Sequence, residues 1–262
     1  MIRVLADMEK EGISIDSTYL NNLDKVFESE LDKLKSGIFE KSGEEFNLNS
    51  PKQLGDILFD KLKLVSKPKT TKTGQYSTSE EVLSSLANEH EIIRSILEWR
   101  SLDKLQNTYV RSLPNEVSSR TGRIHTKFNQ TVTTTGRLSS NNPNLQNIPI
   151  RTENGQKIRE AFIPKNQDFE LLAADYSQIE LRVIASISKD KSMIDAFVKN
   201  QDIHTITASK IYNADPENIT REQRGNAKTV NFGIIYGVSS FGLSPQTNLS
   251  RSESKIMIDN YF

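Results

Sequence analysis

The sequence contains no cysteine among its 262 residues. This absence excludes disulfide bonds, thiolate nucleophiles and cysteine-ligated zinc, and it fits a reducing cytosol. No apolar run approaches the roughly eighteen residues that a membrane span needs. The N-terminal stretch MIRVLADMEKEG has acidic residues from position 7 and no small-residue cleavage site, so the sequence predicts no signal peptide. A composition of 35% hydrophobic and 26% charged residues is ordinary for a soluble globular protein.

The chain also lacks a net charge, because 34 Lys and Arg residues balance 34 Asp and Glu residues. Taken alone, this balance argues against a polyanionic partner. The distribution is uneven, however: residues 94–160 hold eleven Lys or Arg and five Asp or Glu, a local charge of 11 − 5 = +6. A basic segment in a neutral chain is typical of nucleic-acid binding, although a solvated cationic face would give the same count.

The first hundred or so residues predict helices. Asp16 or Ser17 can cap a helix with an apolar residue at every third or fourth position, and Gly43 falls near its end. Ser50 followed by Pro51 is a second start signal, a capping side chain before a proline in the first helical position.

A polar stretch at residues 65–78 predicts a mobile loop after these helices. Thr78 and Glu81 match a capping box, which would start the next helix at that point. A further helical pattern covers residues 93–109.

The pattern changes near Pro114. The threonine-rich segment GRIHTKFNQTVTTTGRLS at residues 122–139 favours strands and hairpins, and AFIPKNQDFELLAADYS at residues 161–177 supplies two more strand-like runs. From Gln178 onward the pattern is helical again. Helices, then strands, then helices predict an α+β fold rather than an alternating α/β fold.

The stretch RGNAKTVNFGIIYG contains four residues at intervals of four, Arg224, Lys228, Phe232 and Tyr236. Steps of four residues lie on one slowly winding face of a helix. Two cations on its first turns suit a polyphosphate, and the aromatic rings can stack on a sugar or base. A buried amphipathic helix with cations at its edge would show the same spacing. Gly233 and Gly237 each cost roughly 1 kcal/mol in a helix, which indicates a bend or the close approach of a backbone or base.

In LLAADYSQIELRVIAS an apolar run, Leu171 to Ala174, ends at Asp175. A carboxylate at the end of a strand is well placed to hold a divalent metal beside a phosphate, but Asp175 could equally cap the following helix. Glu180 lies among apolar residues, so it faces a cleft or pairs with a cation such as Arg182.

The segment TTTGRLSSNNPNLQNIP presents Arg137, Gln146 and Asn147 on turns. Arginine and amide side chains are those that proteins use on groove edges and sugars. The same residues also occur in turns that have no binding role.

Together, DYSQIELR, RGNAKTVNFGIIYG and TGRLSSNNPNLQNIPIR resemble the bacterial family A DNA polymerases, the DNA polymerase I family. The likeness covers essentially the whole chain and includes VLADMEKEGISID, EEFNLNSPKQL, TSEEVL and TGRIHT. It implies a right-hand architecture, with residues 1–115 as a helical thumb, 116–190 as the first part of an antiparallel-sheet palm and 191–262 as partial fingers. It also implies a monomeric, cytoplasmic and nucleoid-associated DNA-directed DNA polymerase that acts in replication and repair.

The resemblance further implies roles for individual residues. Asp175, helped by the Tyr176 carbonyl, would hold Mg²⁺, of which the complete enzyme uses two ions. Primer–template DNA would meet Arg137, Gln146 and Asn147. The residues that would bind the incoming dNTP are Gln178, Glu180, His204, Arg224, Lys228, Phe232 and Tyr236.

The chain departs from the family pattern at its end, MIDNYF, before the His-Asp-Glu turn that carries the second metal-binding aspartate. We therefore expect part of a polymerase that is inactive and only marginally stable by itself. One alternative is a non-catalytic DNA-binding fragment. Another is a single-subunit RNA polymerase, against which Glu180 and Phe232 argue because both are features of deoxynucleotide selection.

Overall fold

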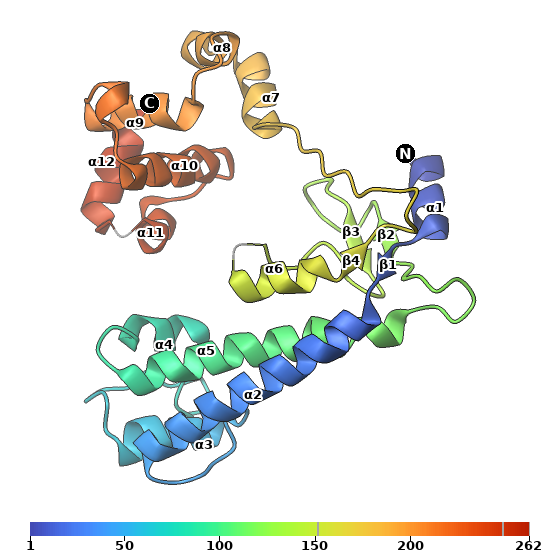
Figure 1. Cartoon of the computed structure of the whole chain (residues 1–262). Coiled ribbons are helices and arrows are strands. Elements are labelled where there is room, and N and C mark those ends of the chain that lie inside the picture. The colour runs from blue at the N-terminus through green and yellow to red at the C-terminus, as the bar shows by residue number, and fades with distance from the viewer. Residues whose placement is uncertain (151, 248, 262) are drawn as a thin grey trace. The chain divides into compact units, whose positions relative to one another are not determined.

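A computed structural model describes residues 1–150, 152–247 and 249–261 of the chain. It divides into two compact units, unit 1 (Met1–Leu172) and unit 2 (Ala173–Phe262), each of which is described by itself (Figure 1). The boundary falls inside the segment that the sequence assigns to the palm, and the division into thumb, palm and fingers stays a prediction. Helices dominate and the strands are short and antiparallel, as the α+β prediction requires.

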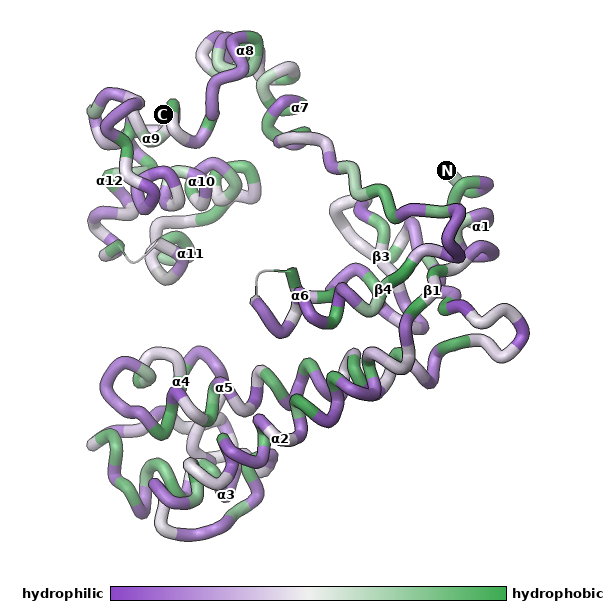
Figure 2. The backbone as a smooth tube through the Cα atoms, in the orientation of Figure 1, coloured by the Kyte–Doolittle hydropathy of each residue, from purple (hydrophilic) through white to green (hydrophobic). Residues whose placement is uncertain are grey.

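Unit 1 is built on two long helices, α2 (Ser17–Ser42) and α5 (Glu91–Leu105), that pack side by side (Figure 1). Apolar residues recur along both helices (Figure 2), and Phe27 of α2 and Ile96 of α5 are fully buried in the shared core. The other helical segments are α1 (Ile2–Glu11), α3 (Pro51–Gly55), a π-helix (Asp56–Lys61), α4 (Glu80–Leu86), a π-helix (Gln106–Val110), a 3₁₀ turn (Leu113–Glu116) and α6 (Glu153–Glu160).

Capping residues set several of the helix boundaries in unit 1. Asp16 accepts a hydrogen bond from the Tyr19 amide at 2.8 Å and starts α2, which ends at Gly43 in the left-handed conformation with φ 74°. Ser50 caps α3, with Pro51 in its first turn. These boundaries confirm the predictions, because each is decided by contacts within a few residues.

The predicted capping box at Thr78 is wrong by one residue, since Ser79 caps α4. Thr78 is instead held by Arg100 of α5, whose Nη1 donates to the Thr78 carbonyl at 2.6 Å. A contact from a distant helix thus fixes Thr78 outside α4. Residues 65–78 form no regular helix, in agreement with the predicted loop.

Two short antiparallel pairs supply the strands. β1 (Ser14–Ile15) pairs with β4 (Phe162–Ile163), and β2 (Lys127–Asn129) pairs with β3 (Ser139–Asn141) in the expected hairpin. The second run predicted as a strand, Leu171–Ala174, is irregular and exposed, and Leu172 is 92% exposed. An apolar run becomes a strand only where neighbours complete its hydrogen bonds, and the described residues provide no partner here.

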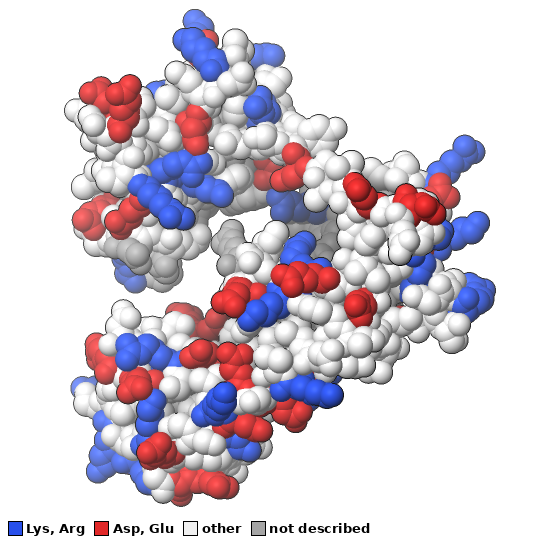
Figure 3. Space-filling view, viewed as in Figure 1, with Lys and Arg blue, Asp and Glu red and all other residues white. Residues whose placement is uncertain are grey.

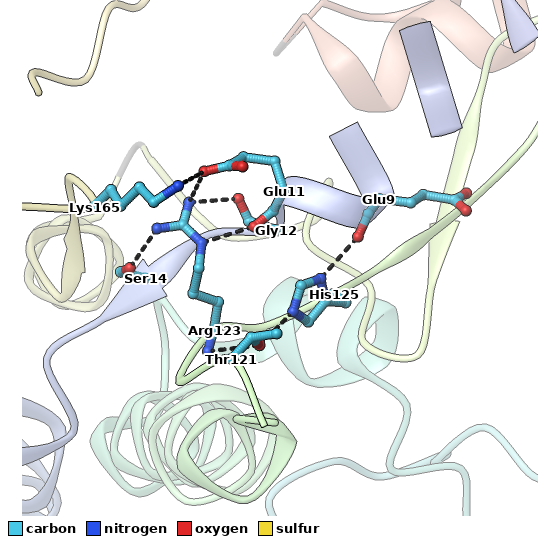
Figure 4. Close-up of polar contacts among 8 residues, drawn as sticks. All are labelled: Glu9, Glu11, Gly12, Ser14, Thr121, Arg123, His125 and Lys165. Atoms are coloured by element: carbon cyan, nitrogen blue, oxygen red, sulfur yellow. Dashed lines mark hydrogen bonds and ion pairs between the residues drawn. The ribbon is translucent and has the colours of Figure 1, made fainter. Parts of the chain in front are cut away.

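Arg123 joins α1 to the strands of unit 1 (Figure 4). Its guanidinium donates to the Glu11 carbonyl at 2.7 Å, the Gly12 carbonyl at 2.9 Å and the Ser14 hydroxyl at 2.8 Å. The neighbouring His125 bonds through Nδ1 to the carbonyl of Glu9 at 2.8 Å. The backbone of Gly12 can lie this close only without a side chain, because a Cβ would stand 2.5 Å from the Ile124 carbonyl oxygen.

The regular secondary structure in the described residues of unit 2 is all helical. Its segments are α7 (Ile179–Ser188), α8 (Lys191–Val198), α9 (Ile203–Tyr212), a 3₁₀ turn (Pro216–Asn218), α10 (Arg221–Ile235), α11 (Ser240–Leu243), a 3₁₀ turn (Ser244–Gln246) and α12 (Arg251–Tyr261). Two small apolar clusters hold them, one around Val230 and Met257 and one around Leu181 and Ile203. None of the helices described in either unit is long and apolar enough to cross a membrane.

Replacing Gly12 by alanine should lower the free energy of unfolding of unit 1 by about 2 kcal/mol or more, because it combines positive-φ strain with a clash against backbone. The matched control is Gly37→Ala in α2, where a Cβ meets nothing within 4 Å, and which should stabilise by about 0.5–1 kcal/mol. Urea denaturation followed by circular dichroism measures both. Equal effects of the two variants would contradict the close approach at Gly12.

Candidate functional site on helices α9 and α10

Helix α10 carries the stripe of cations and aromatics that the sequence predicts. A capping box starts it, in which Thr220 and Gln223 satisfy each other's backbone amides. The helix continues to Ile235, so Arg224, Lys228 and Phe232 lie four residues apart on one face, and Tyr236 follows at the C-cap.

The two glycines of the stripe have local structural reasons. A Cβ on Gly233 would stand 2.5 Å from Cγ1 of Val238, whose amide donates to the Gly233 carbonyl at 2.8 Å as the chain turns back after α10. Gly237 has φ 71°, which favours glycine. The close approach expected from the sequence is made at Gly233, by the chain's own return within unit 2, whereas a Cβ on Gly237 would meet nothing within 4 Å.

Arg224 is paired with Asp202, the N-cap residue of α9. Its Nε and Nη2 donate to Oδ2 of Asp202 at 2.9 and 2.6 Å. The other oxygen of Asp202, Oδ1, accepts from the backbone amides of His204 at 2.8 Å and Thr205 at 3.1 Å. Burial alone would raise the pKa of Asp202, but the hydrogen bonds from Arg224 and the two amides outweigh it and hold the pKa below its usual value. Asp202 is thus a carboxylate at neutral pH.

His204 lies in the first turn of α9 and is only 3% exposed. Its ring lies 5.9 Å from the ring of Phe232, centroid to centroid, so α9 and α10 bring together two of the predicted nucleotide-binding residues. Burial lowers the pKa of His204 to about 4, with Arg224 and Lys228 acting in the same direction against Asp202. The imidazole is therefore neutral at physiological pH.

A buried polar pair supports His204 from α10. Asn231, 1% exposed, places its Nδ2 3.0 Å from His204 Nδ1 and 3.1 Å from the hydroxyl of Thr207. The Thr207 hydroxyl donates in turn to the Ile203 carbonyl at 2.8 Å. With the amide oriented in this way, Nδ1 of His204 accepts and the ring proton lies on Nε2. Sequence reasoning missed Asn231 and Thr207, because no local pattern marks a polar pair between two helices.

Lys228 is exposed, and the part of the chain that the structure describes gives it no hydrogen bond or ion pair. It lies one turn beyond the paired Arg224 on the same helix. The two cations of the stripe are therefore in different states, one held by a carboxylate and one in solvent.

Glu180 of α7 meets Tyr236 at the end of α10, where the Tyr236 hydroxyl donates to Oε2 of Glu180 at 3.0 Å. Arg182, the cation proposed as its partner, donates through Nε to the Ser177 carbonyl at 3.0 Å and lies 4.6 Å from the centre of the Phe197 ring. Unit 2 thus brings Glu180 to one end of the α10 stripe.

Asp175 and Tyr176 are exposed in an irregular segment before α7. Both readings of Asp175 from the sequence, a strand end and a helix cap, are wrong for this structure. The N-cap position belongs to Gln178, which has φ 54° and makes no side-chain capping bond. The strand is absent because its pairing partners are absent from the described residues. Within those residues no three His, Cys, Asp or Glu side chains gather in a way that could hold a metal ion.

Arg137, Gln146 and Asn147 lie on exposed turns of unit 1, on either side of β3. The carbonyl of Asn147 accepts from the Tyr109 hydroxyl at 2.6 Å, and the amide of Gln146 donates to the side chain of Asn144 at 3.0 Å. These backbone bonds fix the turn while the two amide side chains remain at the surface.

The positive segment at residues 94–160 is partly neutralised in three dimensions. Arg111 pairs with Asp24 at 2.8 Å, and Arg123 lies 3.5 Å from the carboxylate of Glu11, so acidic residues from outside the segment face its cations. Figure 3 shows cations and anions interspersed over the helices of unit 1 on the face in view. The linear count of charge therefore overstates the basic character of this surface.

Comparison with known proteins gives the family. The profile described as "DNA polymerase family A" matches residues 17–262. Among curated relatives, DNA polymerase I of Geobacillus stearothermophilus is 51% identical over 259 residues, which cover 99% of this chain and 29% of the relative. DNA polymerase I of Bacillus subtilis is 48% identical, covering 98% of this chain and 29% of the relative. The thermostable DNA polymerase I of Thermus thermophilus is 49% identical, covering 99% and 31%.

A solved structure agrees. The POL domain of Pol1 from M. smegmatis, in complex with DNA primer-template and dNTP, matches with a TM-score of 0.87 and 42% identity, covering 99% of this chain and 46% of that one. The chain belongs to DNA polymerase family A. It spans about 29% of the length of the first curated relatives that it matches.

The burial of His204 predicts a pH effect. Its folded pKa of about 4 lies below the ordinary value of 6.5, so its contribution to folding is complete above pH 6.5 and is lost as the pH falls towards 4. NMR titration should show that the imidazole of His204 stays neutral down to about pH 4. In urea the same residue should titrate near its ordinary value, about 6.5. A midpoint near 6.5 in the folded chain would contradict the buried network.

Proposed function

We propose that this chain is part of a DNA-directed DNA polymerase that adds dNTPs to a primer 3′-hydroxyl on a DNA template. The observation that carries the proposal is the junction of α9 and α10, where an anchored arginine and an exposed lysine lie beside a buried, neutral histidine. Family membership and the M. smegmatis neighbour, whose structure is a complex with DNA primer-template and dNTP, support it. We further propose that the whole polymerase works in replication and repair as a monomer, in the cytoplasm and on the nucleoid.

The triphosphate is the part of the dNTP that this face suits best. Lys228 offers an exposed point charge, and Arg224 keeps guanidinium donors that Asp202 does not use. His204, neutral and protonated at Nε2, contributes a hydrogen-bond donor rather than a charge. In this proposal the histidine orients a phosphate oxygen without adding a positive charge to the site.

The remaining assignments are proposals that follow the family pattern. Phe232 faces the sugar of the nucleotide and Tyr236 the template base. Glu180 lies under the sugar, where it excludes a 2′-hydroxyl, and its bond from Tyr236 holds it at that end of α10. Gln178, at the start of α7, also meets the nucleotide. On unit 1, Arg137, Gln146 and Asn147 contact primer or template.

Mg²⁺ is the metal that the family implies, and Asp175 with the Tyr176 carbonyl offers the type of oxygen ligand that it prefers. One carboxylate and one carbonyl are too few for a two-metal site. Among the described residues no group of three His, Cys, Asp or Glu side chains gathers to hold a metal ion. The residues described here therefore do not form the metal site by themselves. The role proposed for the residues of α9 and α10 is to bind and orient the nucleotide and to neutralise the charge of its triphosphate.

A second candidate is a DNA-binding chain without catalysis, which the lack of a carboxylate cluster in the described residues favours. Primer extension and DNA binding test what this chain does by itself. The 262-residue chain should bind primer–template with an affinity that falls as salt rises and should incorporate no dNTP. Metal-dependent synthesis by this chain would show that it completes the metal site.

We predict that Arg224→Ala and Lys228→Ala each weaken binding of dATP to the chain by about tenfold, since each removes a charged contact to phosphate. The matched control is Lys210→Ala, which removes a cation from α9 whose Nζ bonds to Ser192 on α8. Isothermal titration calorimetry measures all three variants. An equal loss of dATP affinity in Lys210→Ala would show that the effect arises from net charge alone.

A further inference from the structure

We propose that Asp202 is the positioning residue of the triphosphate site. Its carboxylate fixes the orientation of the Arg224 guanidinium on α10. By capping α9, the same carboxylate also fixes the backbone that carries His204. The inference rests on the proposed function, because it concerns how the same site is held ready. Sequence motifs gave Asp202 no role.

Each oxygen of Asp202 has its own partners. Oδ1 caps α9 through the amides of His204 at 2.8 Å and Thr205 at 3.1 Å. Oδ2 takes Nε of Arg224 at 2.9 Å and Nη2 at 2.6 Å. The first turn of α9 and the first turn of α10 are therefore tied through a single side chain.

The donors left on Arg224 are the ones that suit a phosphate. A guanidinium carries five N–H donors in one plane, and Asp202 uses the edge formed by Nε and Nη2. The opposite edge, formed by Nη1 and the remaining hydrogen of Nη2, still presents two parallel donors. This fork matches two oxygens of a phosphate, and the ion pair with Asp202 fixes the plane in which it lies.

Two possible roles for Asp202 predict opposite changes in the affinity for a polyphosphate when its charge is removed. If its charge alone mattered, removing it would strengthen the attraction for a polyphosphate. If it positions Arg224, removing it frees a long side chain that must then be ordered on binding, and the affinity falls. Arg224 and Asp202 are 42% and 37% exposed at their side chains, so solvent screens the charge term while the geometry is kept.

The unit contains a matched residue for the capping role alone. Asp190 caps α8 through the Met193 amide at 2.7 Å, and the described residues show no arginine paired with it. Asn keeps an oxygen for an N-cap but has no charge to hold a guanidinium. Asp202→Asn and Asp190→Asn therefore preserve both caps and differ in the ion pair.

The experiment measures dATP and inorganic tripolyphosphate binding to the whole chain by calorimetry. Asp202→Asn should weaken the binding of both ligands by about five- to tenfold, as expected for the loss of an oriented charged contact. Asp190→Asn should bind both ligands within about twofold of the unmodified chain. In an Arg224→Ala background the further loss on Asp202→Asn should shrink to less than twofold, because the two residues act as one. Asp202→Ser, which also caps, repeats the test if the asparagine variant does not fold.

The outcomes separate the claims. Tighter binding by Asp202→Asn, no change, or an equal loss in the Arg224→Ala background would each overturn the positioning role. If instead Arg224→Ala and Lys228→Ala leave dATP binding unchanged, the triphosphate site is wrong and the inference falls with it. A loss confined to dATP, with tripolyphosphate binding intact, would likewise overturn the role, since Asp202 would then act on the base or sugar.

Discussion

The packing of α10 on α9 sets the positions of His204, Arg224, Lys228 and Phe232 in unit 2. Ala208 and Ala227 are both fully buried where these helices meet, and small side chains let two helices approach closely. Polar groups between the two helices must then find partners, because a buried polar group without one loses its hydrogen bonds to water and destabilises the fold. Asn231 and the Asp202–Arg224 pair supply those partners.

This constraint explains why the histidine and the arginine differ in electrostatic state. His204 lies inside the contact, where burial disfavours its charged form, and Asn231 satisfies it as a neutral ring. Arg224 lies at the open end, where Asp202 reaches it and solvent remains. Burial therefore keeps the histidine neutral, and the open end leaves the ion pair of Arg224 in reach of solvent.

Local signals in the sequence account for much of the fold. Asp16, Gly43 and Ser50 set helix boundaries because capping is a contact between residues a few positions apart. The stripe on α10 was equally readable, since helical spacing is fixed by backbone geometry. The predictions that went wrong depended on distant partners. Arg100 holds Thr78 outside its helix, and Leu171–Ala174 lacks a neighbouring strand in the described residues.

The sequence by itself determined the family, the order of helices and strands and the identities of the cations on α10, because motifs and spacing are local properties. Only the tertiary structure decided that Arg224 is paired, that Lys228 is exposed and that His204 on α9 is neutral. Those states depend on burial and on partners such as Asp202 and Asn231, which lie 22 and 27 positions away from the residues they hold. Packing brings such residues together, and no pattern along the chain records it.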